Sequence, residues 1–369
     1  MLENCRLLLY ASRFSGCHPH TIDERSRVPV NFRLLCIYSL IMCGVYFAVG
    51  YQGNSLKNDC GTNIWMGCLL HHLDQYVQYA YMVLTTLLSC LRHAEFERAI
   101  VAARKFDDLM RLYNNSWCAD NKRANYCKQW LGILAILVTS LFVGILQGLT
   151  GLVVPKMNLF IYMCLITMRT IFSIEIAKFC FLHDELYRGF CHINRLSGKL
   201  TGMGLDTGVS VKNVNRLTIS NIQQLHSYLT DATNHFNSYY SLQLFCWIAC
   251  LLLDTITYIF ILLYQVHSVY LISAQSMAIV CFLLQLIAIS RICNLTCNQA
   301  NALGQIIFLA KTSSFKHTEF SIEEIELGIR VRMYPLRIRV CGLFNLDNRL
   351  AFTAFGIILM YVILASSGH

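Results

Sequence analysis

Charged residues are scarce in this sequence. Asp, Glu, Lys and Arg make up 14% of its 369 residues, whereas a soluble domain carries roughly 25%. Hydrophobic residues account for 56%, and the mean hydropathy is +0.48. Much of the surface must therefore face something other than water, which excludes most classes of soluble protein.

Proline and glycine are also few, with four and 20 residues. This favours long helices over an all-β barrel, so we expect an all-α membrane protein. The apolar stretch Leu7–Tyr10 is too short for a secretory signal. The eighteen cysteines include no CxxC pair and no Cys/His metal spacing. We therefore expect the cysteines to act as small apolar residues within spans or as reduced thiols on the cytosolic side. We expect the protein to bind no metal and no cofactor.

Seven windows of about 20 apolar residues are long enough to cross a bilayer. Together they predict a single seven-helix membrane domain over residues 1–369. The predicted spans are 33–52, 64–91, 129–153, 158–183, 241–265, 273–293 and 346–367.

The distribution of basic residues predicts the orientation of these spans. The N-terminal segment and the connections 92–128, 184–240 and 291–349 hold 26 of the 30 Lys and Arg residues. Basic connections stay in the cytosol, so the N-terminus is predicted inside and the C-terminus outside. The same rule explains the net charge of +9, and no nucleic-acid partner is needed to account for it.

The long cytosolic connections carry apolar stripes at helical spacing, for example Ile222, Leu225 and Leu229. Helices with one apolar face need partners below the bilayer, and four of them can satisfy one another. We therefore predict a cytosolic anchor; the alternative is that each stripe lies flat on the membrane surface. The predicted anchor helices are 92–115, 184–200, 214–240 and 294–340.

The outer loops are short, so a ligand site must lie among the outer halves of the helices. Ionisable residues within spans are costly and are candidates for function. A pocket of polar groups between apolar walls would suit a small organic molecule. The alternative is an internal ion pair of Arg169 with Asp254 or Asp74, and Glu175 with Lys178 is expected to form a helix-surface pair. The candidate ligand-binding residues are His72, Asp74, Tyr81, Gln147, Arg169, Asp254 and Tyr258.

The C-terminal stretch from Arg339 resembles the signature of insect gustatory receptors. Its residues Gly342, Phe344, Asp347 and Tyr361 match that signature. The sequence Leu-His-Ser-Tyr-Leu at 225–229 and Asn237 also look like the family's pattern. The chain departs from the signature at Met360, Ser367 and Gly368, so it resembles a divergent member.

The resemblance implies a ligand-gated, non-selective cation channel that assembles as a homo- or hetero-tetramer and is not an enzyme. Each subunit would contribute its last helix to a central pore, and Gly342, Phe344 and Asp347 would join anchor to pore. An apolar ring on one face of that helix could close the pore by dewetting; the alternative is that this face packs inward. The candidate pore residues are Phe352, Phe355, Gly356, Leu359 and Tyr361.

The functional hypothesis is thus a chemosensory receptor for a small tastant. We expect it to lie in the plasma membrane of sensory-neuron dendrites, where membrane lipids would surround it. A seven-helix receptor coupled to G proteins is the first alternative, although the charge distribution places the N-terminus on the opposite side. A transporter is the second, although the sequence shows no inverted repeat.

Overall fold

The computed structural model describes residues 5–17, 32–55, 65–113, 130–142, 159–200, 218–264, 269–313 and 322–367. Helices account for nearly all of them. In chain order these are α1 (Arg6–Phe14), α2 (Phe32–Ser55), α3 (Trp65–Leu91), α4 (His93–Tyr113), the helical segment Trp130–Phe142, α6 (Leu159–Leu200), α7 (Ile219–Tyr264), α8 (Val269–Ser313), α9 (Ile322–Met333) and α10 (Asn348–Ser367).

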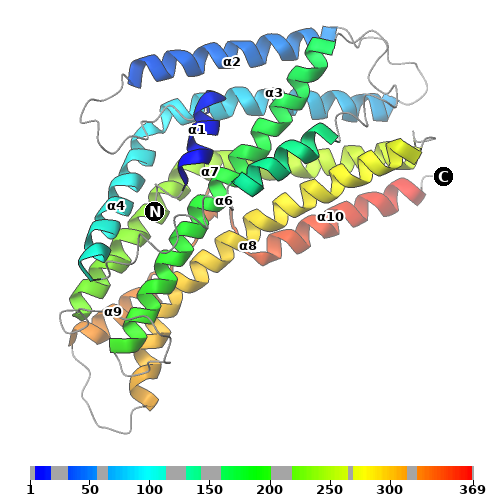
Figure 1. Ribbon diagram of the computed structural model, residues 1–369. Helices are drawn as coiled ribbons and strands as arrows, with labels where there is room; N and C mark the ends of the chain where they lie inside the picture. The colour runs from blue at the N-terminus through cyan, green and yellow to red at the C-terminus, as the bar shows by residue number, and fades with distance from the viewer. Residues whose placement is uncertain are drawn as a thin grey trace.

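Three very long helices, α6, α7 and α8, form the centre of the molecule. They pack on one another along much of their length, and each continues from a range predicted as a membrane span into a range predicted as anchor. Figure 1 shows α4 and α9 gathered around one end of these helices, with the C-terminus at the other end. Within the described residues, α7 and α8 contain the apolar stretches that meet the length of a membrane span, Ile219–Leu263 and Ile272–Phe308. Shorter apolar helices occupy Arg33–Val49, Tyr79–Leu91, Trp130–Phe142 and Asn348–Leu364.

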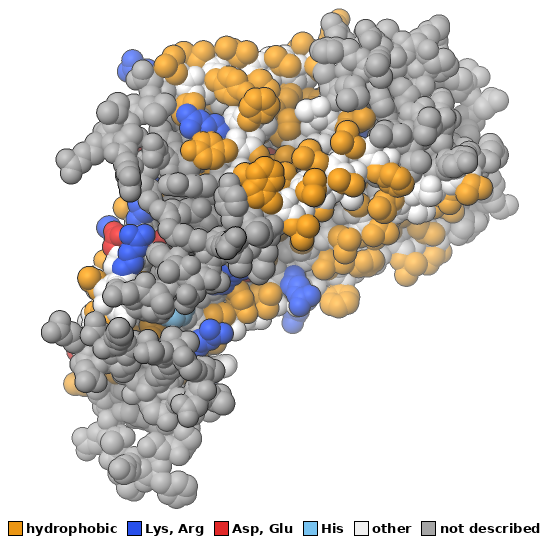
Figure 2. Space-filling model, in the orientation of Figure 1, with side chains coloured by type: hydrophobic (Ala, Val, Ile, Leu, Met, Phe, Trp, Pro, Cys, Tyr) orange, Lys and Arg blue, Asp and Glu red, His pale blue; other side chains and the backbone are white. Residues whose placement is uncertain are grey.

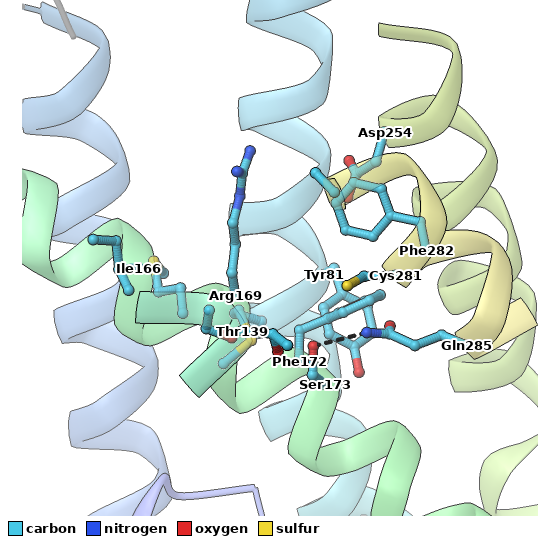
Figure 3. Close-up of a pocket in the computed structure, with 14 residues that line it drawn as sticks. Tyr81, Thr139, Ile166, Arg169, Phe172, Ser173, Asp254, Cys281, Phe282 and Gln285 are labelled. Atoms are coloured by element: carbon cyan, nitrogen blue, oxygen red, sulfur yellow. Dashed lines mark hydrogen bonds between the residues drawn. The ribbon is translucent and has the colours of Figure 1, made fainter. Parts of the chain in front are cut away.

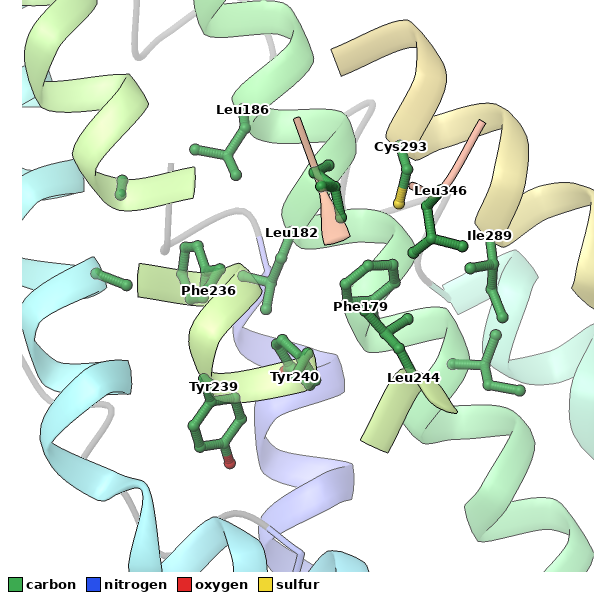
Figure 4. Close-up of a cluster of buried hydrophobic side chains, with 14 of the residues drawn as sticks. Phe179, Leu182, Leu186, Phe236, Tyr239, Tyr240, Leu244, Ile289, Cys293 and Leu346 are labelled. Atoms are coloured by element: carbon green, nitrogen blue, oxygen red, sulfur yellow. The ribbon is translucent and has the colours of Figure 1, made fainter. Parts of the chain in front are cut away.

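The core follows the apolar stripes that the sequence carries at spacings of three and four residues. Leu182, Leu186, Phe236 and Tyr240 are buried where α6 meets α7, and α8 adds Ile289. Figure 4 shows these side chains converging from the three helices. Because each stripe faces another stripe, the apolar faces of these helices are covered within the chain itself.

Polar contacts fix the register of the helices inside this core. The Nε2 atom of His226 on α7 lies 2.9 Å from the carbonyl oxygen of Ala300 on α8. Burial lowers the pKa of His226 below its ordinary value of 6.5, although the bond to Ala300 opposes the shift. The imidazole is therefore neutral at physiological pH, and its N–H donates to the carbonyl.

The segment after α9 differs from the prediction of helix through residue 340. Helix α9 ends at Met333, and a two-stranded antiparallel hairpin follows, made of β1 (Arg339–Val340) and β2 (Phe344–Asn345). Pro335 lacks an N–H group and disfavours a helical conformation at the residue before it, so the helix cannot continue through Tyr334. The hairpin then leads directly into α10.

The connector residues Gly342, Phe344 and Asp347 have separate structural roles. Gly342 adopts φ +71°, a conformation that glycine reaches without steric cost. Phe344 is half-buried and packs against the main core. The Oδ1 atom of Asp347 accepts the N–H of Arg349 at 2.9 Å, which caps the N-terminus of α10.

Hydrophobic side chains also cover much of the outer surface. Figure 2 shows them spread over the middle of the visible face, with Lys and Arg mostly toward the side where α4 and α9 lie. Tyr51, Phe47 and Ile41 of α2 are all exposed. A soluble monomer rarely exposes an apolar surface of this extent, so this face suits a lipid environment.

Candidate ligand pocket and family membership

A cavity of about 80 Å³ lies between α3, the segment Trp130–Phe142, α6, α7 and α8. Three of the predicted ligand-binding residues line it: Tyr81 from α3, Arg169 from α6 and Asp254 from α7. They are separated by 85 or more positions in the sequence, and the packing of the helices brings them together. Figure 3 shows Arg169 and Ile166 on one side of the cavity and Asp254 and Phe282 on the other.

The fourth predicted residue, Tyr258, lies next to the cavity and supports its wall. Its hydroxyl accepts a hydrogen bond from Nη1 of Arg169, and the guanidinium carbon lies 5.3 Å from the centre of its ring. Phe282 of α8 meets the same ring edge-on at 5.5 Å. Arg169 is therefore held by a hydrogen bond and by the face of an aromatic ring, and both fix its orientation.

Asp254 is almost fully buried in the wall formed by α7. Charged groups at such positions interact strongly because the surrounding dielectric is low. Arg169 and Asp254 thus give the cavity one group of each sign, set among apolar and aromatic side chains. Such an arrangement orients a polar molecule along one direction.

The predicted residues His72 and Asp74 lie on α3, but their side chains are outside the part of the chain that the structure describes. Gln147 also lies outside the described residues. Their proposed contribution to the pocket stays a prediction.

Several lining residues were not among the sequence candidates. The most informative is Gln285 of α8, whose Nε2 atom donates to Oγ of Ser173 at 3.1 Å. Its Oε1 atom is buried and has no hydrogen-bond partner among the described residues. Gln285 is a polar residue near the middle of an apolar span, and that signal was available in the sequence. The other lining residues are Met82, Thr139, Ser140, Met168, Phe172, Ala278 and Cys281.

Tyr81 connects the cavity with the core beneath it. Its hydroxyl accepts a hydrogen bond from Nε1 of Trp247 on α7, and its ring meets Phe172 edge-on at 4.8 Å. Trp247 is fully buried and contacts the rings of Phe179 and Tyr240 at 5.6 and 5.8 Å. The cavity floor is therefore part of a continuous aromatic cluster.

Glu175 and Lys178 form the predicted pair, with 2.5 Å between Oε2 and Nζ, but the prediction that they lie on the helix surface is wrong. Both side chains are about 1% exposed. The reason is α1, which packs on α6 at this point: Lys178 Nζ also donates to Oγ of Ser12 at 2.8 Å. No pattern within α6 indicates that an N-terminal helix covers this pair.

The candidate pore residues lie on α10. Phe352, Phe355, Gly356 and Leu359 are exposed, whereas Ala354 and Ile358 are buried against the rest of the chain. Tyr361 is half-buried.

Comparison with known proteins identifies the family. No curated protein sequence matches the chain. Among the solved structures that are similar in fold are two of the insect olfactory receptor OR5 from Machilis hrabei. The complex with eugenol has a TM-score of 0.67 at 14% identity and covers 99% of this chain and 98% of that chain. The second structure of OR5 has a TM-score of 0.61 at 14% identity and covers 98% of this chain and 96% of that chain.

At 14% identity these structures show the fold alone. The family itself is shown by sequence, because the model of the 7tm chemosensory receptors matches residues 5–364. Its members are membrane receptors and not enzymes. The chain belongs to the 7tm chemosensory receptor family.

Proposed function

We propose that this chain is a gustatory receptor that acts as a ligand-gated, non-selective cation channel. It would cross the membrane seven times with its N-terminus in the cytosol and assemble as a tetramer. A small tastant would bind in the cavity, and α10 of each subunit would line the pore. The sensory-neuron dendrite is its proposed location.

The observation that carries the proposal is the composition of the cavity. Aromatic and aliphatic walls surround Arg169, Asp254 and Gln285, which come from three different helices. The Oε1 atom of Gln285, which has no partner within the described part of the chain, favours a ligand with an O–H or N–H donor, because a buried acceptor without a partner is costly. A small alcohol, phenol or amine with an apolar body fits these requirements. Eugenol, the compound bound in the OR5 complex, is such a phenol and is the first probe to test.

The uncovered face of α10 supports the channel part of the proposal. Phe352, Phe355 and Leu359 share one face at spacings of three and four residues, and all three are exposed in the single chain. An apolar helix face of this kind must meet lipid or other subunits. In a symmetric tetramer the four copies of Phe355 could form an apolar constriction.

Substitution Ala278→Phe should abolish ligand binding and ligand-evoked current. Ala278 is 3% exposed and lines the cavity, so a phenyl ring at this position occupies the space that a ligand needs. The matched control is Val280→Phe, because Val280 lies two residues further along α8 and is 51% exposed. We expect the control to respond to eugenol, or to the best compound of a panel of small alcohols, phenols and amines, with less than about a threefold shift in potency. A full response from Ala278→Phe, in receptor of normal elution profile and surface level, would place the ligand elsewhere.

A further inference from the structure

The turn of the β1–β2 hairpin is strained. Val340 pairs with Phe344, and Leu343 N–H donates to the Val340 carbonyl at 2.9 Å, which closes the turn around Cys341 and Gly342. Both central residues have positive φ, +49° at Cys341 and +71° at Gly342. Glycine accepts this conformation freely, but a cysteine rarely does, so contacts from outside the turn must hold Cys341 in place.

Those contacts come from Ser241 on α7. The N–H of Cys341 donates to Ser241 Oγ at 2.7 Å, and the Cys341 thiol lies 3.5 Å from the Ser241 carbonyl oxygen. Ser241 Oγ in turn donates to the carbonyl of Arg339 at 3.5 Å. One serine hydroxyl therefore contacts both β1 and the strained residue of the turn.

The two ends of the hairpin segment are fixed separately. Asn301 of α8 bonds the N–H and the carbonyl of Leu336 at 2.8 and 3.1 Å. At the other end Leu346 is buried between α8 and the core, and its N–H donates to the Ile338 carbonyl at 2.9 Å (Figure 4). The hairpin is thus anchored at its base to α8, whereas its strained turn is held by α7.

Ser241 and the ligand cavity lie on the same uninterrupted helix. Asp254 follows Ser241 by 13 residues on α7, which corresponds to about 20 Å along the axis of an α-helix. Immediately after the hairpin, Asp347 caps α10. A shift or rotation of α7 at the cavity would therefore reach the start of α10 through the contacts of Ser241.

We propose that Ser241 is the positioning residue that couples the ligand cavity to the pore helix. Its hydroxyl holds the strained hairpin turn in one arrangement, and movement of α7 on ligand binding changes that arrangement and with it the position of α10. This inference rests on the proposed channel function and adds to it the route by which the cavity controls the pore.

The test compares Ser241→Ala with two matched variants. Ser241→Thr keeps the hydroxyl, and Ser238→Ala removes an exposed hydroxyl one turn earlier on the same helix. Hydrogen exchange without ligand is measured by mass spectrometry on peptides covering residues 338–347. In Ser241→Ala we expect the Leu343 and Leu346 amides to exchange about fivefold faster, as the loss of one net hydrogen bond implies. Both matched variants should stay within about twofold of the wild type.

The second measurement is the current evoked by eugenol, or by the panel compound that opens the wild type best. Ser241→Ala should shift the half-maximal concentration by about fivefold or more, the lower end of a typical coupling between two sites. Ser241→Thr should restore the wild-type value, which a general loss of stability would not explain.

Unchanged hydrogen exchange in Ser241→Ala would show that the Ser241 hydroxyl does not stabilise the hairpin turn. Faster exchange with wild-type concentration dependence would overturn the coupling, since Ser241 would then stabilise the hairpin without affecting the pore. A wild-type receptor that binds a compound and gives no current would contradict both the proposed channel function and the proposed coupling. The hydrogen-exchange measurement would still test separately whether Ser241 stabilises the hairpin.

Discussion

Replacement of Lys178 by methionine is expected to destabilise the folded receptor by about 3 to 5 kcal/mol. Glu175 and Lys178 are both almost fully buried, and the ammonium group of Lys178 forms a salt bridge with Oε2 of Glu175. Oε1 of Glu175 already has no hydrogen-bond partner among the described residues. Without Lys178 a carboxylate would be left in the interior with no neutralising charge, so the folded state would be strongly disfavoured. The thermal midpoint and the yield of monodisperse solubilised receptor measure the effect.

Three further variants separate the charge effect from other causes. The double variant Glu175→Leu/Lys178→Met removes both charges and should recover most of the stability, because an apolar pair of similar volume can replace a buried ion pair. Ser12→Ala leaves the pair intact and should cost about 1 kcal/mol, the net value of one hydrogen bond. Lys105→Met changes an exposed lysine and should have little effect. A Lys178→Met receptor as stable as the wild type would contradict the buried ion pair.

Replacement of Trp247 by alanine is the second change with a large expected effect, about 3 to 5 kcal/mol of stability. Trp247 is fully buried and fills the space between α3, α6 and α7, so its removal leaves a large cavity. Trp130→Ala, at a tryptophan that is 52% exposed, should change the unfolding free energy by less than about 0.5 kcal/mol.

The variant Trp247→Phe distinguishes the packing of Trp247 from its hydrogen bond. Phenylalanine keeps an aromatic ring in the cluster but cannot donate to the hydroxyl of Tyr81, a residue that lines the candidate ligand cavity. We therefore expect a small loss of stability and a clear change in ligand potency. The same potency as in the wild type would show that the Tyr81 hydroxyl takes no part in ligand recognition.

The helices could be predicted from the sequence because apolar windows and stripes mark them directly. The hairpin at 339–345 could not, since two-residue strands are too short for a period of two to be recognised. Pro335 was nevertheless a visible signal that the anchor helix ends before residue 340. The end of α9 before the connector could thus be predicted in part, but the pairing of β1 with β2 could not.

The sequence pointed to residues of the cavity wall only where a residue was unusual for its surroundings. Arg169 and Asp254 are ionisable residues in apolar spans, and both line the cavity. Gln285 is a neutral polar residue in an apolar span, which is a weaker signal than a charge, so the contribution of α8 was missed. The burial of Glu175 and Lys178 depends on α1, more than 160 residues away in the chain, and a pattern within one helix cannot report it.

We expect the chain itself to conduct cations in response to a small molecule. The most direct test is current recording from the purified receptor in planar lipid bilayers, without G proteins or other signalling components. Eugenol and the panel of small alcohols, phenols and amines are added in turn. We expect a ligand-evoked current that passes both Na⁺ and K⁺ and is absent from Ala278→Phe. Folded receptor that binds one of these compounds but never conducts, alone or with other receptor subunits, would contradict it.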